Sequence, residues 1–140
     1  MRAIPAAISG MVLLLGCGVD STFVGDSNLL TGTYTAQFFL ITPDGEPARD
    51  ILLANGSLTI SFDRNGRTAG SLVLPAGVPG GPATLPMTGT ATISGLTVEF
   101  NQTANSFVNQ VTWNRIEGTI QIANTRVGAA VYDVTLARKP

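Results

Sequence analysis

The sequence contains few side chains that could carry out chemistry. It has no histidine and one cysteine, Cys17, and its only lysine is the penultimate residue, Lys139. Ser–His and Ser–Lys nucleophile pairs are therefore unavailable, as are zinc or haem sites built from the usual Cys and His ligands. The carboxylates fall in turn-rich links or on the polar faces of strands, where solvated surface charge is their ordinary role. We expect a protein that is not an enzyme, with no catalytic residues and no metal site.

The one cysteine lies at the end of an apolar N-terminal run. Arg2 precedes an uncharged stretch from Ala3 to Val19, as in a secretory signal peptide, and the stretch is too short to favour a permanent transmembrane helix. Leu14-Leu15-Gly16-Cys17 resembles the lipobox of bacterial lipoproteins. The resemblance implies cleavage between Gly16 and Cys17, with a diacylglycerol and an N-acyl chain on Cys17 as the only attached groups. It also implies a location in the bacterial cell envelope, lipid-anchored to a membrane surface, and Gly18 favours the outer membrane.

The chain then divides into three parts. Residues 1–16 are the expected signal peptide, residues 17–28 the lipidated cysteine with a polar tether, and residues 29–140 a single domain. Hydrophobic residues make up 44% of the chain and charged residues only 12%, which is typical of a folding chain rather than a disordered one. With 8 basic and 9 acidic residues, there is no electrostatic signature of a nucleic-acid partner.

Alternating apolar and polar residues are the main structural signal after the tether. In Ser57–Phe62, for example, Leu58, Ile60 and Phe62 share one face. Short links such as Asp63–Gly66, with its Asn-Gly pair, and Asn114–Arg115 favour pairing between neighbours in sequence. The sequence predicts an all-β fold, an eight-stranded antiparallel up-and-down meander that closes into a small barrel, with a β-sandwich as the alternative. The eight expected strands lie at 32–42, 57–62, 68–74, 90–94, 96–101, 110–113, 116–122 and 132–136.

Several segments resemble the small lipocalin-like domains of bacterial lipoproteins, which are relatives of the calycin barrels. The segments are Leu30–Tyr34, Leu58–Gly66, Gly89–Val98 and Tyr132–Arg138. Gly32-x-Tyr34 stands where lipocalins have Gly-x-Trp on the first strand. The resemblance implies a lipocalin-like barrel in which Arg138, on the last strand, lies over the Tyr34 ring.

The barrel interior and one loop are the candidate binding features. A barrel of eight strands is either filled by side chains or just wide enough for one small ligand, and the sequence leaves both readings open. The side chains expected to face an apolar ligand are Phe38, Phe62, Phe100, Trp113 and Tyr132. The uncharged loop Pro75–Pro86 could be a lid, a partner contact or a spacer, and Val78 and Leu85 are its candidate contact residues.

These observations favour a non-enzymatic, lipid-anchored envelope protein with a lipocalin-like barrel, which would bind a small apolar ligand if it binds any. The alternative is a structural or inhibitory lipoprotein that contacts another envelope protein. That contact would use the outer surface of the barrel or the Pro75–Pro86 loop.

Overall fold

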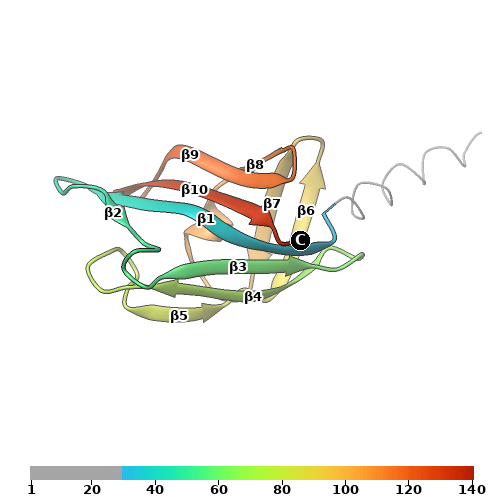
Figure 1. Ribbon diagram of the computed structural model, residues 1–140, viewed down its shortest axis with the longest axis horizontal. Helices are drawn as coiled ribbons and strands as arrows, with labels where there is room; N and C mark the ends of the chain where they lie inside the picture. Colours follow the sequence, from blue (N-terminus) through green and yellow to red (C-terminus); the bar gives the residue numbers. More distant parts are fainter. Residues whose placement is uncertain (1–29) are drawn as a thin grey trace, which may run out of the picture.

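The computed structural model describes residues 30–140, which form a β-barrel (Figure 1). The expected signal peptide, Cys17 and the tether lie outside the described residues. Two short strands, β2 (Arg49–Asp50) and β5 (Ala83–Pro86), and one 3₁₀ helix, η1 (Phe107–Gln110), lie outside the barrel wall. The wall consists of β1 (Gly32–Pro43), β3 (Ser57–Phe62), β4 (Arg67–Leu74), β6 (Gly89–Ser94), β7 (Thr97–Gln102), β8 (Trp113–Ile116), β9 (Thr119–Val127) and β10 (Ala130–Arg138).

The wall strands pair in the order in which they occur in the chain. Each lies antiparallel to the next, and β10 pairs with β1 from Tyr34↔Arg138 to Pro43↔Ala130, so the sheet closes. Closure gives each wall strand a partner on both sides over at least part of its length. The predicted eight-stranded antiparallel meander barrel is confirmed, and the sandwich alternative is not what the chain forms.

A bulge in β1 reverses the face of Phe38. The pairing with β10 shifts between Ala36 and Phe38, so one extra residue, Gln37, interrupts the alternation. Phe39 is consequently 1% exposed, whereas Phe38 is 48% exposed. The prediction that Phe38 faces the interior is wrong, because the period of two holds only as far as the bulge.

The turn between β8 and β9 corrects a second expectation. It lies at Glu117–Gly118, not at Asn114–Arg115, and both of its residues have positive φ, 38° and 80°, as a type I′ hairpin turn requires. This turn pairs Ile116 with Thr119 and Arg115 with Ile120. Directly paired residues share a face of a sheet, so Arg115 lies on the inward side with Ile120. Ile116, on the opposite face, is 49% exposed.

The barrel wall is fully paired at one end only. At the end where β1 begins, β4 pairs with β6 at Arg67↔Thr90, and β7 pairs with β8 at Thr97↔Asn114. Toward the opposite end, residues 71–74 of β4 pair with β5 rather than with β6. The segment between β7 and β8 forms η1 there and adds no strand to the wall. We call the first the entry end, because Leu30 begins there, and the second the mouth.

The interior is filled by side chains. Six aromatic rings form a continuous series from the entry end to the mouth, and adjacent centroids lie between 4.4 and 6.3 Å apart. Aliphatic side chains including Leu58, Ile60, Ile120 and Leu136 complete the core at 0% exposure. The series runs Tyr34, Phe62, Phe100, Trp113, Phe107 and Tyr132.

A small polar network fastens η1 to the wall where strand pairing stops. The Asn109 side chain accepts a hydrogen bond from the Gln102 backbone N–H (2.9 Å) and donates one to the Gln102 carbonyl (3.1 Å). The Thr68 hydroxyl donates to the Gln102 side-chain oxygen (2.9 Å), which connects β4 with β7. The two Asn109 bonds occupy backbone groups of Gln102 that β8 does not reach, because the pairing of β7 with β8 covers only Thr97 and Val98.

The bulge predicts opposite outcomes for two adjacent phenylalanines. Phe39→Ala should lower the free energy of unfolding by about 3–5 kcal/mol, because it leaves a cavity in the core. Phe38→Ala should lower it by at most about 1 kcal/mol, because half of that side chain is already in water. Urea denaturation of the two variants measures both values, and a larger loss for Phe38→Ala would contradict the register.

The polar network predicts a second difference in stability. Asn109→Ala removes both hydrogen bonds to the Gln102 backbone and should lower the free energy of unfolding by about 1–3 kcal/mol. Asn114, which is exposed and makes no side-chain hydrogen bond among the described residues, provides the control. Asn114→Ala should change stability by less than about 0.5 kcal/mol. Equal losses would show that the network does not hold η1 in place.

Candidate functional site

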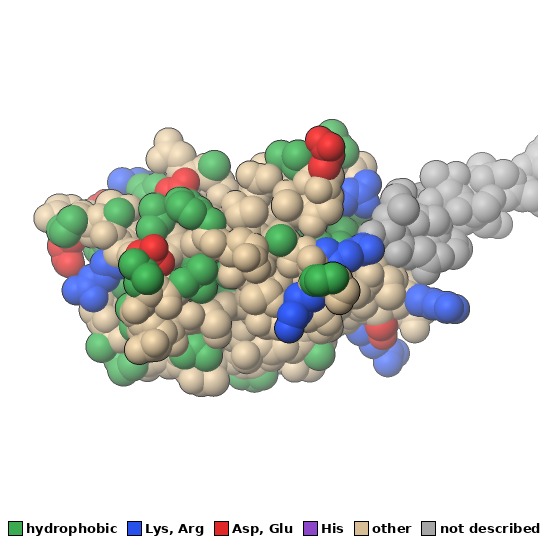
Figure 2. All heavy atoms as spheres, viewed as in Figure 1, with side chains coloured by type: hydrophobic (Ala, Val, Ile, Leu, Met, Phe, Trp, Pro, Cys, Tyr) green, Lys and Arg blue, Asp and Glu red, His purple; other side chains and the backbone are tan. Residues whose placement is uncertain are grey.

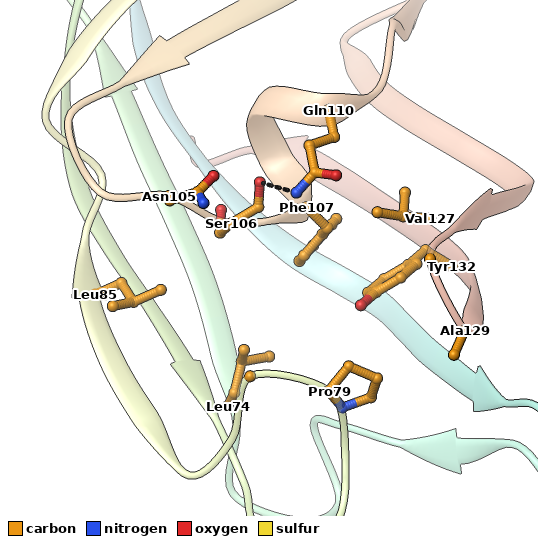
Figure 3. Close-up of a pocket in the computed structure, with 12 residues that line it drawn as sticks. Leu74, Pro79, Leu85, Asn105, Ser106, Phe107, Gln110, Val127, Ala129 and Tyr132 are labelled. Atoms are coloured by element: carbon orange, nitrogen blue, oxygen red, sulfur yellow. Dashed lines mark hydrogen bonds between the residues drawn. The ribbon is translucent and has the colours of Figure 1, made fainter.

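The mouth of the barrel contains a pocket of about 410 Å³ (Figure 3). It lies where the wall is open, between the end of β4, the loop that leads to β5, the segment containing η1 and the β9–β10 turn. Its side chains are mainly apolar, and none is charged. The lining residues are Leu74, Pro79, Gly80, Leu85, Asn105, Ser106, Phe107, Gln110, Val127, Gly128, Ala129 and Tyr132.

Tyr132 forms the floor of this pocket. Its ring stacks on Phe107 with centroids 4.4 Å apart and an interplanar angle of 18°. Figure 3 shows its hydroxyl directed into the pocket, toward Leu74 and Pro79. Burial raises the pKa of Tyr132 above its ordinary value, because the phenolate would lose hydration. The hydroxyl therefore stays neutral and can donate or accept a hydrogen bond.

The 3₁₀ helix η1 positions Phe107 against Tyr132. Ser106 caps its start, with the hydroxyl accepting from the Val108 backbone N–H at 3.2 Å. Gln110 closes the turn by donating to the Ser106 carbonyl at 3.3 Å (Figure 3). The Trp113 indole N–H donates to the Val108 carbonyl at 3.2 Å, which ties the helix to the core. The pocket wall on this side is thus held by its own hydrogen bonds.

The Pro75–Pro86 loop forms the opposite wall. Leu85, on β5, is partly buried and lines the pocket. Val78 is only 6% exposed and packs into the core cluster, so its side chain faces the barrel rather than a partner, an arrangement that is compatible with a lid. An apolar side chain in a proline-rich loop can fold back onto the barrel as readily as it can face a partner. Arg49 donates to the Ala76 carbonyl at 3.4 Å and holds the loop from outside.

The structure separates the residues expected to face a ligand. Phe62, Phe100 and Trp113 contact one another in the filled interior, and Phe38 lies outside the barrel. Tyr132 alone of that set lines the pocket. Phe107 is not among the residues predicted from the sequence, although Ser106 before an apolar pair is a recognisable helix start.

A second pocket, of about 460 Å³, lies at the entry end. Arg138 lies over the Tyr34 ring, with its guanidinium carbon 5.4 Å from the ring centroid. It also donates to the Tyr34 hydroxyl from Nη2 (2.9 Å) and Nε (3.2 Å), so the predicted Arg138–Tyr34 contact is confirmed. The pocket is lined by Leu30, Tyr34, Leu96, Arg115, Glu117, Gly118, Thr119 and Arg138.

Comparison with family models, with curated proteins and with solved structures gives no match to this chain. Within residues 30–140, no helix is long and apolar enough to cross a membrane. The same residues bring together no group of three or more His, Cys, Asp or Glu side chains that could hold a metal ion.

Proposed function

We propose that this protein is a non-enzymatic, lipid-anchored protein of the bacterial cell envelope whose lipocalin-like barrel binds a small apolar molecule at its mouth. The observation that carries the binding proposal is the uncharged pocket between the Pro75–Pro86 loop, η1 and the β9–β10 turn. Its volume of about 410 Å³ lies in the range of small-molecule sites.

The chemistry of the lining defines the ligand class. Leu74, Leu85, Phe107 and Val127 offer an apolar surface, so an apolar body is favoured. The neutral hydroxyl of Tyr132 can orient one uncharged polar group of the ligand. A free carboxylate or phosphate would find no cation in this pocket.

The ligand position follows from the packed interior. The aromatic series fills the interior along the barrel axis. The mouth is therefore the place where a guest fits without displacing core side chains. Here the guest would contact Tyr132 and Leu85. It would not contact Phe62, Phe100 or Trp113.

The anchor proposal rests on the N-terminal sequence. Cys17 follows Gly16 at the end of an apolar run, and it is the only cysteine of the chain. Acyl chains contribute about 0.8 kcal/mol per buried methylene, and two or more chains hold a protein stably on a membrane. We place the protein on the outer membrane, with the acyl chains on Cys17 as its only attached groups.

The alternative function is contact with another envelope protein, and β5 is the observation that favours it. Within the described residues β5 pairs with β4 only, so its second edge offers backbone groups to an added strand. A peptide segment of a partner could extend the sheet there. This reading would use the Pro75–Pro86 loop as a docking edge rather than as a pocket wall.

The pocket proposal predicts that filling the mouth prevents binding. Ala129, an exposed residue of the β9–β10 turn, lines the pocket, so Ala129→Trp should place an indole in it. In residues 18–140, binding of the uncharged dye N-phenyl-1-naphthylamine should fall at least about tenfold, a loss of about 1.4 kcal/mol. Ala54→Trp, in another exposed turn that lines neither the mouth pocket nor the entry-end pocket, should leave binding unchanged. Equal dye binding by the two variants would contradict the mouth site.

The lipobox predicts that processing depends on one sulfur atom. Cys17→Ala should abolish labelling of the protein by a fatty-acid probe in bacterial cells and leave the uncut precursor, because the acceptor thiol is missing. Ser21→Ala, four residues further along, should be labelled and cut normally. Labelled Cys17→Ala protein would refute the anchor.

A further inference from the structure

The entry end of the barrel is the basic end of the molecule. Figure 2 shows Lys and Arg side chains gathered around the point where the described chain begins. The two remaining basic residues of the described chain, Arg49 and Arg126, lie toward the mouth, where β1 pairs with β2 and β9 with β10. The basic residues at the entry end are Arg64, Arg67, Arg115, Arg138 and Lys139.

Backbone pairings bring these basic residues to the same end of the barrel. The Lys139 backbone donates to the Thr33 carbonyl, and the Arg138 backbone donates to the Gly118 carbonyl, so the C-terminus lies between the start of β1 and the β8–β9 turn. Gly32 pairs with Phe62, which leads directly into the β3–β4 turn that carries Arg64. Five positive charges thus surround one end of a small barrel.

Few acidic groups offset this charge. The acidic residues of the entry-end turns are Asp63 and Glu117. Asp63 accepts hydrogen bonds from the backbone N–H groups of Asn65 (2.8 Å) and Arg67 (3.0 Å) and keeps its negative charge. Glu117 lines the same pocket as Arg115 and Arg138. Five basic residues against these two acidic ones leave an excess of positive charge. The salt bridge found among the described residues, Arg126–Asp44, is at the mouth.

Arg115 is the most informative of the basic residues. The Glu117–Gly118 turn puts it on the inward face with Ile120, and it lines the 460 Å³ pocket. Its Nη1 atom is buried and has no hydrogen-bond partner among the described residues. A buried cationic donor without a partner is costly, so turning this guanidinium toward an anion in the pocket that Arg115 lines would supply the missing acceptor.

We propose that the entry end docks on an anionic lipid surface, with one phosphate head group held in the pocket by Arg115 beside Arg138. Guanidinium groups match phosphate oxygens with paired hydrogen bonds. Arg64, Arg67 and Lys139 add attraction that acts within a Debye length of about 8 Å of the membrane. The orientation rests on the proposed anchor: the chain joins the barrel at Leu30, so acyl chains on Cys17 would hold this end toward the membrane.

The test uses the mature, lipidated protein in phosphatidylcholine vesicles with and without phosphatidylglycerol. Backbone hydrogen exchange in the β8–β9 turn and at the C-terminus is the readout. Exchange should slow several-fold in vesicles that contain phosphatidylglycerol, and high salt should remove the difference. Equal exchange in the two kinds of vesicle would overturn the proposal.

Matched variants assign the effect to the pocket. Arg115→Gln should remove most of the protection, whereas Arg115→Lys should retain part of it because the charge remains. Arg126→Gln, which removes an equal charge at the mouth, should retain all of it. A loss in Arg126→Gln as large as in Arg115→Gln would overturn the proposal, as would protection produced by inorganic phosphate on pure phosphatidylcholine vesicles.

Vesicle flotation separates this proposal from the anchor. If the chain carries no lipid, it will fail to float with pure phosphatidylcholine vesicles, which refutes the anchor alone. Vesicles containing phosphatidylglycerol should still retain such a chain through the basic end at low salt. A chain that floats with neither kind of vesicle would refute both proposals.

Discussion

Pairing between the first and last strands is the constraint on which the rest of this structure depends. β1 and β10 lie at opposite ends of the described chain, and their ladder extends from Tyr34↔Arg138 to Pro43↔Ala130. Ordering so long a loop costs conformational entropy, and burial of the filled interior offsets that cost. Without the ladder, β1 and β10 would expose free edges, and the inward faces of all eight strands would be exposed to water.

Closure at the entry end is also what makes the two ends different. The Tyr34–Arg138 contact seals the ladder where β1 begins, and the neighbouring strands are paired at the same level. Toward the mouth the wall is incomplete, because β4 pairs with β5 there and the segment after β7 forms η1. A polar network centred on Gln102 holds the gap together. The mouth pocket is thus a consequence of incomplete pairing, not of an empty interior.

The sequence predicts the barrel well because alternation and short turns are local signals. Phe62, Phe100, Trp113 and Tyr132 are buried as their strands require. Each error within the strands follows an event that resets the period of two. A single extra residue in β1 turns Phe38 outward, and this bulge is recognisable only once β10 is in place as its partner.

The same reasoning explains why neither pocket could be found from the sequence. The Glu117–Gly118 turn, placed three residues later than expected, exchanges the faces of Arg115 and Ile116 and creates the basic pocket. Val78 is buried because the loop folds back over the mouth, which depends on contacts distant in sequence. The apolar pocket needs four segments to meet, and no one of them has a distinctive motif.

The opposite chemistry of the two ends gives the molecule a direction. The aromatic series connects Tyr34 at the basic end with Tyr132 at the apolar mouth, so the barrel axis joins the two sites through a packed core. If the proposed anchor holds the entry end at the membrane, the mouth is directed away from the same membrane. An apolar guest would then reach the pocket from the aqueous side, and the polar rim of Asn105, Ser106 and Gln110 is suited to that exposure. A rigid, filled barrel separates the two sites, so we expect them to bind independently rather than to be coupled.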